Sequence, residues 1–157
     1  MKVILLSVGK TDNKHFVQLI EEYRKRVNFY IPFEMIVVPD LKNRKTISEK
    51  EQKTQEGNVL LKSLQPGDWV VLLDDKGKQY TSIEFARYLE KKSHTVPKRL
   101  VFMVGGPYGF SQDIYDAANE KMSLSKMTFT HQMVRMVFTE QLYRAMTILH
   151  NEPYHHE

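Results

Sequence analysis

The chain has 157 residues, of which 41% are hydrophobic and 27% are charged, so it is too apolar for a disordered protein and has the size of a single domain, residues 1–157. It contains no cysteine, which excludes disulfides, zinc–thiolate sites and cysteine nucleophiles together. A net charge of +4 at pH 7 favours anionic partners such as RNA, although a bias this small does not establish one.

The first nine residues carry one lysine and an apolar run that is too short for a secretion signal or a membrane span. Together with the lack of cysteine, this start predicts a cytoplasmic protein with no membrane association. The same apolar run is the first strand of the expected fold.

Apolar runs rich in valine and isoleucine alternate along the chain with segments of helical period. The expected strands run from Val3 to Val8, Glu34 to Val38, Trp69 to Leu73, Leu100 to Val104 and Met122 to Lys126. Several are apolar at every position, which is typical of parallel strands covered by helices on both faces. The order of elements therefore predicts an α/β fold with a mostly parallel sheet and helices on both faces.

The expected helices lie between these strands. They run from Lys14 to Val27, Ser48 to Leu64, Ser82 to Lys92, Ser111 to Glu120 and Gln132 to His150, with Ser82 and Ser111 as N-caps. The last helix is the clearest, because its apolar residues form a single stripe made of Val134, Phe138, Leu142, Ala145, Met146 and Leu149.

The segment before and inside the second helix is basic and contains Lys42, Arg44, Lys45, Lys50 and Lys53. Its apolar cluster comes later, at 59–61, so we expect only the second half of this helix to pack firmly. The basic residues form either a solvated helix face or an arm that faces phosphates. The solvated face is the commoner meaning of such a run.

A glycine-rich loop from Gly105 to Phe110 follows an apolar strand and precedes a capped helix. Open α/β sheets bind ligands at the carboxyl ends of their strands, so this loop predicts a ligand site. Glycine lets the backbone approach a ligand closely, and Pro107 fixes the turn. A plain strand-to-helix turn is the alternative. The spacing matches neither G-x-G-x-x-G nor G-x-x-x-x-G-K-[ST], which argues against dinucleotides and nucleoside triphosphates.

A second candidate loop, from Ser123 to Thr130, mixes apolar side chains with small hydroxyl groups. This mixture suits a flat adenine ring, because backbone groups would contact the ring edge while Leu124, Met127 and Phe129 shield its faces. Taken alone, the same residues would be interpreted as a short strand with core contacts.

Four polar residues of the last helix lie off its apolar stripe: Arg135, Glu140, Gln141 and Arg144. Glu140 and Arg144 are spaced i, i+4, which predicts an ion pair on the helix surface. The alternative is a basic face on which Arg135 and Arg144 contact RNA phosphates.

Three segments together resemble one family. They are the strand and loop from Val101 to Gly109, the loop from Leu124 to Phe129, and the run from His131 through Glu140 and Arg144 to Pro153-Tyr154-His155. The opening strand with Val8-Gly9, the strand end Leu73-Asp74 and the overall length agree as well. Over essentially its whole length, the chain is similar to the SPOUT-class methyltransferases that modify N3 of a pseudouridine in large-subunit ribosomal RNA.

The resemblance implies a trefoil knot in the C-terminal third, a homodimer, and S-adenosylmethionine bound against the knotted loops. By position, the implied cofactor contacts are Leu73, Gly105, Leu124, Ser125, Lys126, Met127, Thr128 and Phe129. The chain departs from the family pattern at Tyr108, where an acidic or amide residue is common, and at His156, which replaces an arginine of the family tail.

The implied reaction is an in-line displacement at a methyl carbon, so positioning should supply most of the catalysis and no metal is required. N3 must lose its proton before it attacks, which requires a base or binding of the anionic form. The candidate bases in the family-like segments are His155, Tyr154, His131 and Glu140. We expect His155, with Tyr154, to act from a mobile tail that closes over the substrate.

Binding of RNA phosphate is the alternative role of His155, beside Arg135 and Arg144. One monomer has few basic residues, which predicts an RNA site shared between the two chains of a homodimer. A catalytically silent, ribosome-associated RNA-binding protein on the same fold is the alternative function. A hydrolase is disfavoured because the chain contains no G-x-S-x-G motif.

Overall fold

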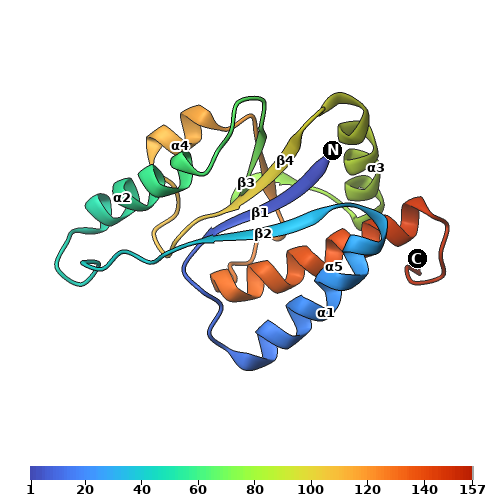
Figure 1. The fold of residues 1–157 in the computed structure, drawn as a ribbon, viewed down its shortest axis with the longest axis horizontal. Coiled ribbons are helices and arrows are strands. Elements are labelled where there is room, and N and C mark those ends of the chain that lie inside the picture. The colour runs from blue at the N-terminus through green and yellow to red at the C-terminus, as the bar shows by residue number, and fades with distance from the viewer. Residues whose placement is uncertain (157) are drawn as a thin grey trace.

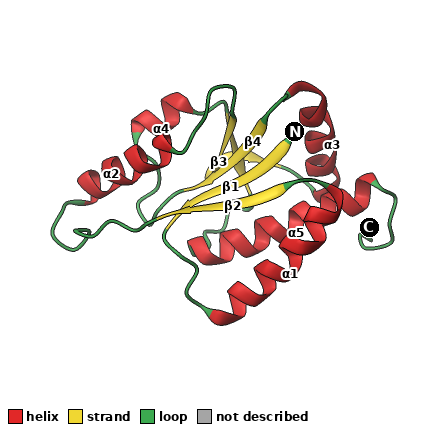
Figure 2. Ribbon diagram, in the orientation of Figure 1, coloured by secondary structure: helices red, strands yellow, loops and turns green. Residues whose placement is uncertain are grey.

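The computed structural model describes residues 1–156 and has a five-stranded sheet at its centre (Figure 1, Figure 2). The strands are β1 (Lys2–Val8), β2 (Phe33–Val38), β3 (Trp69–Gln79), β4 (Arg99–Val104) and β5 (Glu120–Ser123). Their order across the sheet is β2-β1-β4-β3-β5, and each neighbouring pair is parallel. The predicted α/β fold with a mostly parallel sheet is confirmed.

Helices cover both faces of this sheet. They are α1 (Lys14–Tyr30), α2 (Glu49–Lys62), α3 (Ser82–Thr95), α4 (Gln112–Ala117) and α5 (His131–Leu149). Helices α1, α3 and α5 share a core with Leu5 and Phe102, whereas α2 and α4 share another with Ile4 and Met103 (Figure 1). Successive side chains of a strand point to opposite faces, so β1 supplies Ile4 to one core and Leu5 to the other. Among the described residues, no helix is long and apolar enough to cross a lipid bilayer.

Helix α3 is capped by Thr81 rather than by the predicted Ser82. The Thr81 hydroxyl accepts a hydrogen bond from the backbone N–H of Glu84, and the Glu84 carboxylate accepts one from the backbone N–H of Thr81. Such a reciprocal cap requires a glutamate or glutamine three positions after the capping residue. Of the two adjacent hydroxyl residues, only Thr81 has one. The predicted cap at Ser111 is present on α4.

The end of the sheet differs from the prediction as well. Strand β5 occupies 120–123 instead of 122–126, and α4 ends at Ala117 instead of Glu120. The reason is that Glu120 already pairs with Val71 of β3, which starts the strand early and stops the helix. The last helix runs over 131–149, one residue earlier at each end than predicted.

Strand β3 continues beyond its predicted end at Leu73. Residues 74–77 bulge out of the sheet, because Leu73 and Lys78 both pair with Met122 of β5. The bulge also brings two backbones together, since a side chain at Gly77 would lie 2.6 Å from the backbone N of Met122. The charged composition of 74–77 is that of a loop, so the sequence pattern ended the strand too soon. Bulges often lie beside active sites, where they redirect side chains.

The chain leaves β1 and β4 in opposite directions along the sheet. Strand β1 connects through α1 to β2 on one side, and β4 connects through α4 to β5 on the other. In open α/β sheets such a reversal opens a crevice at the carboxyl ends of the strands, where ligands bind. The glycine loop after β4 lies at this edge.

Candidate functional site

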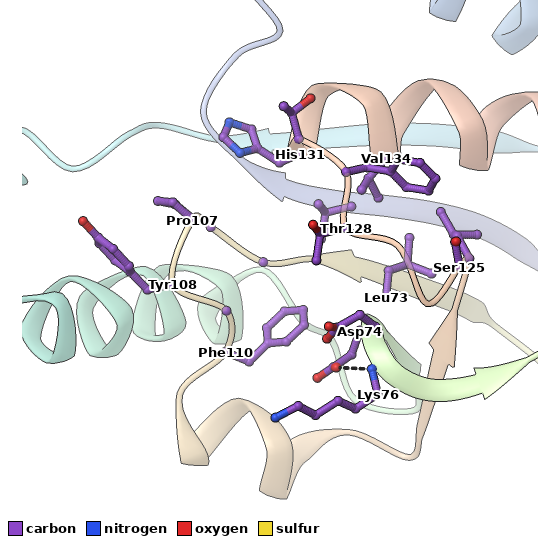
Figure 3. Close-up of a pocket in the computed structure, with 18 of the residues that line it drawn as sticks. Leu73, Asp74, Lys76, Pro107, Tyr108, Phe110, Ser125, Thr128, His131 and Val134 are labelled. Atoms are coloured by element: carbon purple, nitrogen blue, oxygen red, sulfur yellow. Dashed lines mark hydrogen bonds between the residues drawn. The ribbon is translucent and has the colours of Figure 1, made fainter.

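A cavity of about 540 Å³ opens between the bulge of β3 and the carboxyl end of β4 (Figure 3). We call it the first cavity. Its walls are residues 73–76 at the bulge of β3, the glycine loop at 104–110, and residues of the loop from β5 into α5 between 124 and 131, with Val134 of α5 beside them. Its volume falls in the range of small-molecule sites, roughly 300–1,000 Å³. The three segments are far apart in sequence, and the parallel sheet brings them to one edge.

Most of the predicted cofactor residues line the first cavity: Leu73, Gly105, Leu124, Ser125, Met127, Thr128 and Phe129. Lys126 is the exception and does not contribute to the wall. Met127 is 76% exposed and Phe129 is 41% exposed, so large apolar side chains stand open to solvent at the cavity. Exposed apolar surface of this kind marks a binding surface. The structure thus brings the two predicted loops together, while their role as cofactor contacts stays a prediction.

Gly106 has no room for a side chain. A Cβ atom at this position would lie 2.0 Å from Oε2 of Glu56 on α2, far inside van der Waals contact. Glu56 is 5% exposed, and its Oε1 accepts a hydrogen bond of 2.8 Å from Nε2 of Gln52. The glycine loop therefore rests on a buried polar pair of α2. The prediction that only the second half of α2 packs firmly is wrong, because Gln52 in its first half is buried as well.

The buried Glu56 carboxyl should make stability depend on pH. Burial raises the pKa of Glu56 above its ordinary value of 4.5, although the hydrogen bond from Gln52 acts in the opposite direction. As pH rises from this ordinary value, the unfolded chain loses the Glu56 proton before the folded chain does, so this residue reduces stability with increasing pH. Urea unfolding of Glu56→Gln and of wild type at about pH 4 and about pH 8 measures this effect. We expect the unfolding free energy of the variant minus that of wild type to be larger at the higher pH. A difference between the two proteins that is the same at both pH values would contradict this expectation.

Asp74 extends from the β3 bulge into the first cavity (Figure 3). Its Oδ2 accepts a hydrogen bond of 2.6 Å from the Tyr115 hydroxyl of α4, and its Oδ1 accepts one of 2.9 Å from the backbone N–H of Lys76. Burial disfavours the charged carboxylate, but these hydrogen bonds outweigh burial and hold the pKa of Asp74 below its ordinary value. Burial and the contact with Asp74 raise the pKa of Tyr115 to about 12. The cavity therefore presents a fixed negative charge, which suits a cationic ligand.

The loop from β5 to α5 is held in place by its own hydroxyl groups. Ser123 Oγ donates a hydrogen bond of 2.8 Å to the Ser125 carbonyl, and Ser125 Oγ accepts one of 3.0 Å from the backbone N–H of Met127. Thr130 then ends the loop as the N-cap of α5. Hydrogen bonds within the loop therefore fix the shape of its backbone, which favours a pre-formed site.

Arg135 lies inside the protein and not on the polar helix face where the sequence pattern placed it. It is 1% exposed, its Nη2 donates a hydrogen bond of 2.8 Å to the Val8 carbonyl, and its Nη1 donates one of 2.9 Å to Oγ1 of Thr11. The guanidinium thus fastens α5 to the end of β1 and faces no solvent from which RNA could approach. Acceptors for its two Nη groups help the protein to tolerate this buried arginine, although its Nε has no hydrogen-bond partner among the described residues. Those acceptors are far away in sequence, so the helical spacing did not reveal them.

The tail at 150–156 is anchored against α1 and α5, although the sequence suggested a mobile segment. The Tyr154 hydroxyl donates a hydrogen bond of 3.0 Å to Oε1 of Glu140 and lies 3.2 Å from the Tyr23 hydroxyl. Arg144 donates two hydrogen bonds, of 3.1 Å and 2.6 Å, to the same oxygen of Glu140. The predicted ion pair between Glu140 and Arg144 is therefore present. Nη1 of Arg144 lies 3.4 Å from Nδ1 of His155.

These contacts bear on the predicted catalytic role of Tyr154. Burial, followed by the hydrogen bonds to Tyr23 and Glu140, raises the pKa of Tyr154 well above its ordinary value of 10. A neutral hydroxyl that already donates to Glu140 is a poor proton acceptor at neutral pH. The geometry therefore suits Tyr154 as a group that positions its neighbours rather than as a base.

Neither Tyr154 nor His155 lines the first cavity. The cavity contacts the first turn of α5 at His131 and Val134, whereas the tail follows the last turn at Leu149. The Tyr154 hydroxyl contacts Glu140 and His155 contacts Arg144. These two residues of α5 lie roughly 9 Å and 15 Å along the helix axis from Val134. Within one protomer, the predicted catalytic residues therefore lie beside the middle of α5, whereas the predicted cofactor residues lie near its first turn.

The sequence interpretation missed several residues of the first cavity, among them Asp74, Lys76, Tyr115 and Val134. Asp74 carried a usable signal, because it follows the apolar run of β3 at the edge where ligands bind. Tyr115 carried none, since its partner Asp74 is 41 residues away in the chain. Val134 was assigned to the apolar stripe of the core, although it also lines the cavity.

Comparison with known proteins places the chain in context. The family model described as "Predicted SPOUT methyltransferase" matches residues 1–155. A protein named "Ribosomal RNA large subunit methyltransferase H" from Parabacteroides distasonis is 66% identical over 157 residues, and one of the same name from Phocaeicola vulgatus is 60% identical over 157 residues. Both matches cover 100% of each chain.

A solved structure supports the fold. The crystal structure of a probable methyltransferase from Bordetella pertussis Tohama I superposes with a TM-score of 0.54 at 13% sequence identity. The superposition covers 92% of this chain and 96% of the other. At this level of identity, the likeness concerns the arrangement of the backbone alone.

Proposed function

Because the chain belongs to the SPOUT methyltransferase family, we propose that it transfers a methyl group from S-adenosylmethionine to N3 of a pseudouridine in large-subunit ribosomal RNA. The full-length similarity to relatives named as ribosomal RNA large subunit methyltransferases supports this substrate class. The observation that carries the proposal is the first cavity, where all but one of the implied cofactor residues lie together. We expect the protein to act on ribosomal particles in the cytoplasm.

The residues of the first cavity fit S-adenosylmethionine. The apolar side chains of Leu124, Met127 and Phe129 suit an adenine ring, and the glycine loop lines the same cavity. Asp74 remains charged at neutral pH, which suits a ligand with cationic groups. When bound, S-adenosylmethionine supplies a methyl group that its sulfonium activates for displacement.

The protein itself contributes orientation, exclusion of water and removal of a proton. The apolar wall at Met127 and Phe129 would exclude water from the reacting atoms. We propose that His155 accepts the N3 proton of the base or contacts an RNA phosphate, and that Arg144 contacts phosphate beside it. The contact of 3.4 Å between Arg144 and His155 supports a joint role, and Tyr154 would hold both in place through Glu140.

We further infer a homodimer in which each site uses both chains. His155 does not line the first cavity of its own chain, and its contact with Arg144 lies roughly 15 Å along α5 from Val134, which supports this inference. A two-fold axis that pairs α5 with its copy in antiparallel fashion would set the tail of one chain beside the cavity of the other, since such an interface is self-complementary. Val17 and Leu19 on α1, which packs against α5, are 45% and 44% exposed and could be covered in this way. Family membership also implies a trefoil knot in the C-terminal third.

Two measurements test the proposed function. Calorimetry should detect binding of S-adenosylmethionine to the purified protein, and mass-spectrometric mapping of ribosomal RNA from a strain that lacks the protein should show the loss of one methylated pseudouridine. Reintroduction of the gene should restore that methyl group. The alternative, a catalytically silent RNA-binding protein on the same fold, predicts no cofactor heat and unchanged ribosomal RNA.

A further inference from the structure

Helix α2 and the start of α4 enclose a second cavity of about 350 Å³. Lys50, Lys53 and Thr54 are spaced i, i+3, i+4 on α2, so they share one helix face, and this face lines the cavity opposite Ser111 and its neighbours. Phe110 and Tyr115 line both the first and the second cavity. The cavity lined by the basic face of α2 therefore shares two aromatic side chains with the proposed catalytic cavity.

The lysines of this face carry charge that the protein does not neutralise. Among residues 1–156, no ion pair within 4.0 Å involves Lys50 or Lys53, whereas the more buried cations Lys92, Arg99 and Arg144 each contact a carboxylate. The second cavity has one carboxylate, Asp113, in its wall against two lysines. Unpaired cations that line a cavity attract anions such as phosphate more strongly than a paired surface does.

The basic segment continues beyond the helix. Lys42, Arg44 and Lys45 are exposed in the loop before α2, and the long segment between β2 and α2 extends away from the sheet (Figure 1). Arg44 lies 3.6 Å from Asp40, which is a long contact between exposed groups, and Lys42 and Lys45 form no ion pair within the described residues. The basic residues of this segment therefore continue the positively charged surface that begins at Lys50 and Lys53.

Tyr108 stands at the rim of the first cavity with its ring free for a partner. It is 45% exposed, and within residues 1–156 its ring has no aromatic contact and its hydroxyl no hydrogen bond. Figure 3 shows the ring turned away from Leu73 and Asp74, at the outer side of the glycine loop.

We propose that the substrate RNA reaches the first cavity across α2, with Lys50 and Lys53 bound to phosphates that flank the target nucleotide and Tyr108 stacked on a flanking base. This inference rests on the proposed function. An electrostatic groove combined with an aromatic platform is the arrangement by which proteins hold unpaired RNA strands. A solvated helix face would explain the lysines alone, but it accounts neither for the cavity that they line nor for the exposed ring beside the catalytic opening.

The phosphate contacts are tested with Lys50→Ala/Lys53→Ala, assayed by methylation of ribosomes from a strain lacking the protein. Lys91→Ala/Lys98→Ala is the matched control, because these two exposed lysines, on α3 and directly before β4, line neither cavity and the charge change is equal. We expect KM for ribosomes to rise about tenfold in the α2 variant, and the plot of log kcat/KM against log salt to become less steep by about one unit per lysine. Equal KM values and salt slopes in the two double variants would overturn the phosphate contacts.

The stacking contact is tested with Tyr108→Ala and Tyr108→Phe. Loss of one stacked base should raise KM for ribosomes about tenfold in the alanine variant, and phenylalanine should recover most of that loss because it keeps the ring. Equal losses in both variants would assign the effect to the hydroxyl and overturn stacking, as would no loss in the alanine variant. Failure of the proposed function is a separate result: the wild-type protein would then methylate no ribosomes.

Discussion

Gly106→Ala should weaken the binding of S-adenosylmethionine roughly 10- to 100-fold, because overpacking of a filled site costs about 1–3 kcal/mol. The new methyl group would lie 2.0 Å from Oε2 of Glu56, so either the carboxylate or the glycine loop must move. The carboxylate is the end of a side chain, but it is buried and its Oε1 is held by Gln52, so we expect the loop to move as well. Because the loop forms one wall of the first cavity, calorimetry with S-adenosylmethionine should register the change, and single-turnover methylation should fall with it.

A second substitution distinguishes the local clash with Glu56 from a general loss of folding. In Gly106→Ala/Glu56→Ala the carboxylate is gone and the added methyl group has space, so cofactor binding should recover relative to Gly106→Ala. Thermal unfolding of all variants shows whether they fold. The two residues touch, so their effects should be strongly non-additive. Cofactor binding by Gly106→Ala at wild-type strength would show that the loop position seen here does not matter for the ligand.

The parts of this fold that could be predicted from sequence were those with a local signal. Apolar runs such as Val101 to Val104 marked buried strands, and the stripe on α5 marked a core helix, because burial on both faces or on one face leaves a regular pattern. Three of the five strands, β1, β2 and β4, were predicted to within one residue at both ends. The class of fold followed from the alternation alone.

The errors came from contacts between distant residues. The bulge of β3 is set by its pairing with Met122, and the burial of Arg135 by the Val8 carbonyl. Neither partner can be recognised from the local sequence. A charged run there predicts a loop, and an arginine off the apolar stripe is predicted to be exposed. Tertiary partners that satisfy polar groups override the local pattern in both places.

The candidate site shows the same division. The glycine loop and the loop at 124–129 were chosen from residue type and family resemblance, and the sheet topology places both at one cavity. Asp74 and the buried pair of Gln52 and Glu56 were not chosen, because their importance depends on where α2 and the bulge of β3 meet these loops. The extent of the single domain, residues 1–157, and the trefoil knot stay predictions.

His155→Ala should reduce single-turnover methylation by about 100-fold or more if the imidazole accepts the N3 proton, which is the usual size of a general-base contribution. The pH profile distinguishes the two proposed roles. Loss of a base should remove one limb of the dependence of the rate on pH, whereas loss of a phosphate contact should raise KM and leave the shape of that dependence unchanged. A rate and a pH profile equal to those of the wild type would remove His155 from both roles.

If each site of the homodimer uses both chains, two inactive variants should restore activity when they form a mixed dimer. Gly106→Ala has a damaged cavity and an intact tail, and His155→Ala has the reverse. Coexpression with two different affinity tags permits purification of the mixed dimer, in which one of the two sites combines the intact cavity of one chain with the intact tail of the other. We expect this mixed dimer to recover about half of the wild-type rate per dimer, since one site in two is complete.

The activity of the mixed dimer also tests the opposite arrangement, in which each tail serves its own chain. If the tail served the cavity of its own chain, each chain of the mixed dimer would contain one damaged element, and the mixed dimer would be as inactive as either parent. Sedimentation of the wild-type protein provides the independent check, because a monomer with full activity would refute a shared site whatever the variants do. The position of the anchored tail favours complementation, because in one chain His155 contacts Arg144, roughly 15 Å along α5 from Val134, and does not line the cavity of that chain.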